Sequence, residues 1–89
     1  MARLVVTHGV GNMETWLAKG AEREKVFAQF SSSHRVYRLQ GADRVAIVSE
    51  DVDLAKMAAL MPTPEMQATM KAHTVLEPLE MYVEIPDAK

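Results

Sequence analysis

The segment RLVVTHGVGN (residues 3–12) decides the fold of this chain. It begins with a run that is apolar at odd and even positions alike. A strand with one solvent-exposed face alternates apolar and polar side chains instead. We therefore predict a strand over residues 3–10 with both faces buried. Gly11 and Asn12 end this strand, and Asn12 is a favourable N-cap for a helix that follows directly.

The rest of the chain continues as helix, strand, strand, helix and strand. Apolar side chains at helical spacing, Trp16 among them, predict one helix over residues 13–30, with Arg23 outside its apolar stripe. Two β-rich runs over residues 36–39 and 45–48 flank a short turn and predict a hairpin.

A second helical segment follows the hairpin and is interrupted. Proline lacks an amide hydrogen and clashes with the preceding turn, so Pro62 must break the helix. The segment TPE (residues 63–65) restarts it, with a threonine cap and a proline at the first helical position. Beyond Pro78, alternating apolar and polar side chains predict the last strand over residues 79–85.

This order of elements predicts an α+β protein with one four-stranded antiparallel sheet and both helices on one face. The strands also carry apolar residues on the face that the helices do not reach. A domain of this size gains stability from oligomerisation. We therefore expect a second copy of the chain to cover that face, which makes the protein a homodimer.

Length and composition restrict the class of protein. The 89 residues predict a single domain over residues 1–89, and a net charge of −2 excludes nucleic acid and anionic membranes as expected partners. No apolar run approaches the ~20 residues that cross a bilayer, and residues 1–15 lack the pattern of a secretion signal. Without cysteine there is no disulfide, thiol nucleophile or thiolate metal site, and we expect a cytoplasmic location.

Several short motifs point to a known family. They are the segment HGVGN (residues 8–12) at the end of the first strand, Trp16 in the first helical turns, TPEM (residues 63–66) at a helix start, and the final segment of residues 78–82. Together they resemble the dimeric α+β barrel superfamily, which includes small monooxygenase-like proteins and muconolactone-isomerase-like enzymes. The resemblance covers nearly the whole chain.

This resemblance implies a ferredoxin-like βαββαβ protomer, two of which pack sheet against sheet to enclose a barrel. Thr7 and Asn12 stand where many such sequences carry histidine and aspartate. Chemistry that needs a second histidine or that carboxylate therefore lacks its residues in this chain.

Four side chains are candidates for a site. His8 lies late in the first strand, where it can act as a base or a hydrogen-bond donor; the alternative is a strand histidine satisfied by a neighbour. Tyr37 and Tyr82 are predicted to lie mid-strand and to orient a ligand, with core or interface packing as the alternative. For Trp16 we favour anchoring of the first helix on the sheet over stacking against a ligand.

Metal and cofactor motifs do not fit the sequence. His8, His34 and His73 are not spaced as ligand pairs, so we expect no metal. The segment GVG (residues 9–11) starts like a dinucleotide fingerprint, but position 14 is glutamate and no second βαβ unit follows. We expect no bound cofactor. The seven methionines are read as adaptable core residues, with an apolar pocket as the minority interpretation.

Two classes of function remain open. One is a cofactor-independent enzyme, monooxygenase-, isomerase- or cyclase-like, that acts on a small aromatic or polyketide-like compound. In this hypothesis an apolar barrel binds the substrate, His8 moves a proton and a tyrosine orients the reacting oxygen. The other is a non-catalytic dimer that binds a small ligand or serves as a scaffold. Fold alone does not choose between them.

Overall fold

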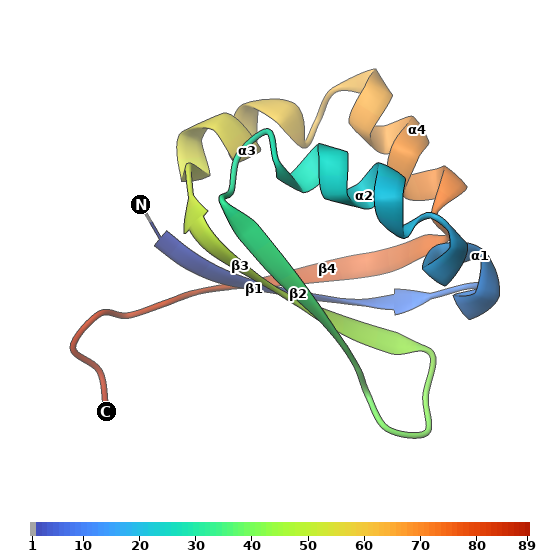
Figure 1. The fold of residues 1–89 in the computed structure, drawn as a ribbon, viewed down its shortest axis with the longest axis horizontal. Coiled ribbons are helices and arrows are strands. Elements are labelled where there is room, and N and C mark those ends of the chain that lie inside the picture. Colours follow the sequence, from blue (N-terminus) through green and yellow to red (C-terminus); the bar gives the residue numbers. More distant parts are fainter. Residues whose placement is uncertain (1) are drawn as a thin grey trace.

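Strand β1 lies in the interior of a four-stranded antiparallel sheet with the order β2-β3-β1-β4 (Figure 1). The computed structural model describes residues 2–89. Its elements are β1 (Ala2–Val10), α1 (Met13–Ala18), α2 (Gly20–Phe27), β2 (Ser33–Arg38), β3 (Arg44–Val52), α3 (Leu54–Leu60), α4 (Pro64–Ala72) and β4 (Val75–Val83). The helices lie on one side of the sheet, which confirms the predicted α+β class and element order.

The alternation of β1 assigns its side chains to the two faces of the sheet. Leu4, Val6 and His8 are buried beneath the helices, whereas Val5 and Thr7 are half-buried on the other face. We call that other face, which no helix of the described residues covers, the open face. Of the two faces predicted to be buried, only the face beneath the helices is buried within the protomer.

The core fills the space between the helices and the sheet. One group of buried side chains contains Leu4, Val6, Phe30, Val52, Met57 and Met66. A second group contains Val10, Met13, Trp16, Val45 and Ile47. Phe27 packs against both groups, so α2 joins the two halves of one apolar layer.

The first helix differs from its prediction. A single helix was expected over residues 13–30, but the chain forms α1 and α2 with a break at Lys19. Gly20 follows the break, and glycine costs roughly 1 kcal/mol relative to alanine inside a helix. A second correction concerns Arg23, which was placed outside the apolar stripe and is 8% exposed.

The last strand also begins earlier than expected. It starts at Val75 rather than residue 79 and ends at Val83 rather than residue 85. Pro78, which follows a cis peptide bond, lies inside it. This is compatible with pairing because β4 is an edge strand, where a missing N–H can face away from the neighbouring strand.

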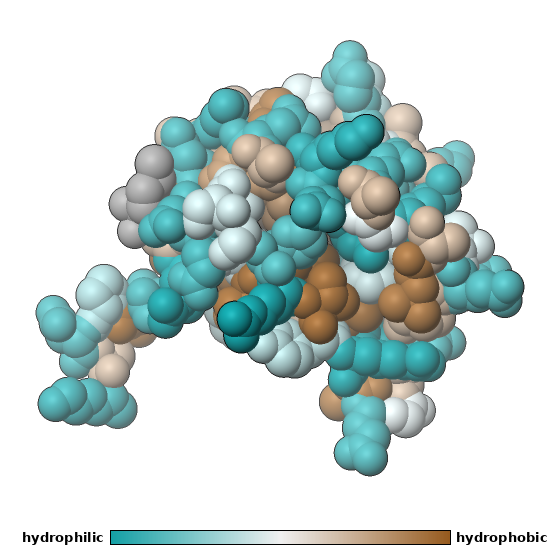
Figure 2. All heavy atoms as spheres, in the orientation of Figure 1, coloured by the Kyte–Doolittle hydropathy of each residue, from teal (hydrophilic) through white to brown (hydrophobic). Residues whose placement is uncertain are grey.

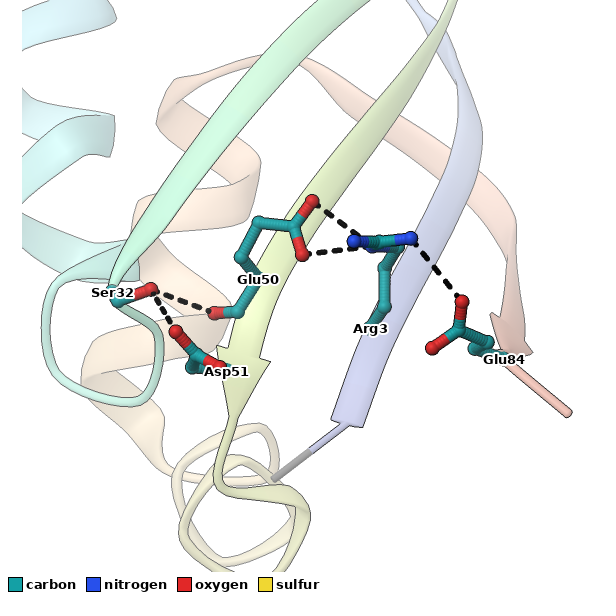
Figure 3. A network of polar contacts seen from close by, with 5 residues as sticks. All are labelled: Arg3, Ser32, Glu50, Asp51 and Glu84. Carbon is teal, nitrogen blue, oxygen red and sulfur yellow. Dashed lines mark hydrogen bonds and ion pairs between the residues drawn. The ribbon is translucent and has the colours of Figure 1, made fainter. Parts of the chain in front are cut away.

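Ion pairs cross the open face from strand to strand. Arg3 of β1 donates to Glu50 of β3 at 2.8 Å and to Glu84, just after β4, at 3.2 Å (Figure 3). At the other end, Arg44 of β3 pairs with Glu80 of β4. Such exposed pairs each contribute about 0–1 kcal/mol, so their main effect is to fix side-chain positions around the apolar residues between them.

The helical layer presents a mostly hydrophilic surface on the side seen in Figure 2, where hydrophobic atoms show mainly along the line between the helices and the strands. None of the helices within residues 2–89 is both long and apolar enough to cross a membrane.

Ser49 provides a test of the core. Its side chain is fully buried beneath the helices, and its hydroxyl has no hydrogen-bond partner. Because an unpaired buried hydroxyl costs about 1–3 kcal/mol, Ser49→Ala should leave the free energy of unfolding unchanged or raise it. Urea denaturation measures this change. As a control, Ser31→Ala removes a 2.7 Å bond to the Phe27 carbonyl and should cost about 0.5–1.5 kcal/mol. If Ser49→Ala lowers the free energy of unfolding more than Ser31→Ala does, the Ser49 hydroxyl is not an unpaired buried group.

Candidate functional site

A cavity of about 70 Å³ lies inside the protomer, between the sheet and the helices. Its walls are mainly apolar and include Val6 and Ile47 from the sheet and Met57, Met61, Met66 and Met70 from the region of α3 and α4. Four side chains with ring or guanidinium nitrogens also belong to the lining residues, namely His8, Trp16, Arg23 and His73. The candidate site is therefore an almost wholly apolar cavity whose lining residues include four nitrogen-bearing side chains.

His8 is held as a neutral imidazole with one free nitrogen. Its Nδ1 lies 2.7 Å from the Gly9 carbonyl oxygen, and since a carbonyl only accepts, Nδ1 carries the hydrogen. Nε2 is then the nitrogen with the lone pair. Burial lowers the pKa of His8, an effect that the bond to Gly9 partly offsets and the charges of Arg44 and Arg23 reinforce. His8 is thus a base at neutral pH.

Trp16 lies against His8 and is 1% exposed. The two rings meet edge to face with centroids 6.1 Å apart. The position of Trp16 follows from the start of α1, where the Asn12 side chain accepts from the Thr15 amide at 3.0 Å. The backbone amide of Asn12 in turn donates to the Thr74 hydroxyl at 3.0 Å, which ties α1 to the end of α4.

Arg23 and His73 complete the site and were not predicted. The Arg23 Cζ lies 3.5 Å from the centroid of the Trp16 ring, a cation–π contact, and Nη1 donates to the Trp16 carbonyl at 2.8 Å. The same Nη1 lies 3.4 Å from His73 Nδ1, which can only accept from it. His73 Nε2 then carries the hydrogen and faces a Glu22 oxygen at 3.5 Å. Burial lowers the pKa of both Arg23 and His73.

The sequence carried a signal for Arg23. Residues 16, 20, 23, 27 and 30 follow one another at intervals of three or four, which is the spacing of a single helical stripe. An arginine within an otherwise apolar stripe indicates a buried charge. His73 carried a similar signal, because residues 66, 70 and 73 follow one another at intervals of four and three on the same helical stripe.

The two tyrosines lie on the open face. Tyr37 pairs with Ala46 on β2 and β3, Tyr82 pairs with Val5 on β4 and β1, and their exposed fractions are 52% and 56%. They therefore lie across the sheet from His8 and Trp16. The structure brings His8 and Trp16 together in one cavity and separates both tyrosines from it, so no tyrosine orients a ligand beside His8 within the protomer.

The third histidine takes no part in the cavity. His34 stacks on Phe27 with ring centroids 4.8 Å apart. Within residues 2–89, no three histidine, aspartate or glutamate side chains are grouped so that they could hold a metal ion.

Comparison with known proteins gives a fold. No protein-family model matches the chain, and no curated protein matches it. A solved structure of a candidate antibiotic biosynthesis monooxygenase from Deinococcus radiodurans is similar over 100% of this chain and 95% of that one, with a TM-score of 0.62 and 12% identity. The chain has a ferredoxin-like α+β fold. The predicted protomer is thereby confirmed, and the likeness shows the fold alone.

The shifted pKa values of the three histidines predict how the free energy of unfolding depends on pH. The pKa values of His8, His34 and His73 are all lowered, each chiefly by burial. Below their unfolded pKa of about 6.5, the unfolded chain binds more protons than the folded one, so stability falls as pH falls.

Urea denaturation at about pH 7.5 and about pH 5.5 tests this, because ordinary carboxylates with pKa values near 4 stay ionised across that range. We expect a lower free energy of unfolding at the lower pH and a smaller difference in His8→Gln. Equal stability of the unmodified protein at both pH values contradicts the expectation.

Proposed function

We propose that this protein is a small homodimeric enzyme that acts, without a tightly bound cofactor, on a small aromatic or polyketide-like compound. The observation that carries the proposal is the neutral His8, whose Nε2 is free and whose ring lines an apolar cavity beside Trp16. The monooxygenase-like fold of the Deinococcus radiodurans protein is consistent with this reaction class.

The reaction begins with proton removal. His8 Nε2 takes a proton from a carbon or oxygen acid of the bound aromatic compound, and the electron pair stays on the substrate as a delocalised anion. Monooxygenase-, isomerase- and cyclase-like reactions can all start from such an anion. The apolar walls exclude water and so protect it from immediate reprotonation.

The open face supports the proposed homodimer. The centre of this face carries Val5, Ala46, Val48, Tyr37 and Tyr82. The ion pairs of Arg3 and Arg44 lie around it. A face with an apolar centre and a charged rim has the composition of a protein interface, and two tyrosines add to it because aromatic residues are enriched there. In the dimer the tyrosines pack between the two sheets.

Replacement of His8 tests the catalytic proposal. With a panel of one- and two-ring hydroxylated aromatic compounds and product detection by mass spectrometry, His8→Ala should lower kcat/KM roughly 10²-fold or more. Tyr37→Phe is the matched control. Tyr37 lies on the opposite face of the sheet, so this substitution should leave turnover unchanged. If no compound is turned over and His8→Ala only weakens binding modestly, the non-catalytic alternative is correct.

Light scattering tests the homodimer. The protein at micromolar concentration should have twice the 9.9 kDa mass of the chain. Val48→Glu places a charge within the open face and should shift the mass toward that of the monomer. Leu54→Glu introduces the same charge on α3, where the leucine is already 41% exposed, and should leave the mass unchanged. A stable monomer before any substitution refutes the dimer.

A further inference from the structure

We infer that the seam between α2 and α4 is the entrance to the cavity and that protonation of His73 opens it. By the seam we mean the line along which α2, with Arg23, meets α4 and its C-cap residue His73 (Figure 1). This inference concerns the regulation of access to the proposed site. It rests on the proposed function in taking the cavity as the place where the substrate binds.

The side chains around the cavity are shielded from solvent. His8, Trp16 and His73 are 3%, 1% and 3% exposed. The volume of about 70 Å³ holds a few waters, since one water needs roughly 10–15 Å³ measured in this way. A compound with an aromatic ring can therefore reach His8 only if part of the wall moves.

The parts of the wall differ in how firmly polar contacts hold them. The sheet is held by β1, whose backbone is paired on both edges. α4 is tied to the end of α3 by Gln67, whose side chain donates to the Met61 carbonyl at 2.9 Å. Within residues 2–89, a single hydrogen bond joins α2 to α4, the 3.4 Å contact between Arg23 Nη1 and His73 Nδ1. The seam is thus the part of the wall with the weakest polar connection.

Three unpaired donors are gathered around this seam. Trp16 Nε1, Arg23 Nε and His73 Nε2 are buried and have no hydrogen-bond partner. The Glu22 oxygen that faces His73 Nε2 at 3.5 Å lies beyond the usual N–H···O range of about 2.7–3.2 Å. Buried donors are normally paired with protein or water. Opening of the seam gives these donors access to water, which offsets part of the cost of exposing the apolar wall.

Protonation of His73 reverses the contact across the seam. In the neutral ring, Nδ1 accepts a hydrogen bond from Arg23 Nη1. In the protonated ring both nitrogens are donors, so the Nδ1–H group faces an N–H group of the charged guanidinium. The hydrogen bond between α2 and α4 is then replaced by repulsion between two cations, which is stronger in a buried setting than in water.

The other charges near His73 leave the balance in favour of opening. Glu22 of α2 attracts the imidazolium, but its side chain is 52% exposed, so solvent screens the attraction. Burial is the main cause that lowers the pKa of His73; Glu22 opposes the decrease, and Arg23 and Lys19 add to it. The closed form therefore binds a proton less readily than an open form in which the ring is hydrated.

The direction of the pH effect follows from this difference. Because the open form binds the proton more readily, opening becomes more frequent as pH falls through the pKa of a hydrated histidine, about 6.5. At about pH 5.5 such a histidine is protonated roughly ten times more often than it is neutral. Between about pH 7.5 and about pH 5.5, the open population can therefore rise by at most about 10-fold, a limit reached when the closed form stays neutral.

Hydrogen exchange of the Trp16 indole N–H, measured by NMR, tests the opening. Trp16 is the only tryptophan of the chain, so its indole signal is unambiguous. We define protection as the exchange rate of a free indole or amide divided by the measured rate at the same pH. The Val6 backbone amide lies on β1, which is paired on both edges, and reports global unfolding.

At about pH 7.5 the protection of Trp16 should be lower than that of Val6, because the seam opens without unfolding of the sheet. At about pH 5.5 the protection of Trp16 should be several-fold lower still, within the limit of about 10-fold. Equal protection of the two groups, or no decrease at the lower pH, overturns the inference.

Replacement of His73 separates the seam from the other histidine of the cavity. Glutamine does not titrate and its amide oxygen can accept from Arg23, so His73→Gln should reduce the change of Trp16 protection with pH to less than about 2-fold. His8→Gln is the matched control, since it changes a buried histidine on β1, outside the seam, and should keep the pH dependence. If the dependence survives in His73→Gln and is lost in His8→Gln, the inference fails.

Glu22→Gln tests the same contact from an exposed position, where the fold tolerates substitution. It removes the carboxylate that attracts the protonated imidazole. The protection of Trp16 at about pH 5.5 should therefore fall further, while that at about pH 7.5 should stay the same. Higher protection in Glu22→Gln than in the unmodified protein at the lower pH contradicts the inference.

Nitrobenzene tests whether the seam is the entrance, because it is neutral at both pH values and quenches tryptophan fluorescence. Stopped-flow quenching of Trp16 gives the association and dissociation rates of this probe. At the lower pH both rates should rise by the same factor as the opening, which leaves the dissociation constant unchanged, since a gate acts on passage in both directions. Rates that stay constant while the protection of Trp16 falls show that ligands enter elsewhere and overturn the inference.

The outcomes for the entrance and for the enzyme are distinguishable. A seam that opens with falling pH in a protein that turns over no compound supports the entrance and rejects the catalytic proposal. Turnover that depends on His8, in a protein whose Trp16 protection does not change with pH, supports the enzyme and rejects the entrance.

Discussion

The rest of the structure depends on one constraint, which is the assignment of alternate β1 side chains to the two faces of the sheet. This strand is paired on both edges, so its register fixes that of β3 and β4. Because side chains alternate with a period of two, a shift by one residue would move His8 to the open face and Thr7 beneath the helices. The apolar contacts of Leu4 and Val6 with the helical layer hold the observed register and thereby keep His8 in the cavity.

The fold could be predicted from local patterns because each element has a clear period and clear ends. The apolar run of β1, the turn between β2 and β3 and the threonine-capped start of α4 were enough for the order of elements. The break at Lys19 and the early start of β4 were missed. The break lies directly before Gly20, and beyond it the Arg23 side chain donates to the Trp16 carbonyl. Pro78 is compatible with a strand because β4 lies at the sheet edge, which depends on pairing with residues distant in sequence.

The site was predictable in part, and the missed part is instructive. His8 and Trp16 were chosen from motif and position, and they lie together in the cavity. Arg23 was placed outside the apolar stripe of the first helix, although its spacing from Trp16 places it on that stripe. Tyr37 and Tyr82 were chosen as residue types that suit a ligand, but the register of the sheet turns both away from His8. Spacing was the better guide than residue type.

The electrostatics of the cavity favour a base that returns its proton. Burial, followed by the charges of Arg44 and Arg23, lowers the pKa of His8, so the imidazolium formed by proton transfer is a stronger acid than free histidine.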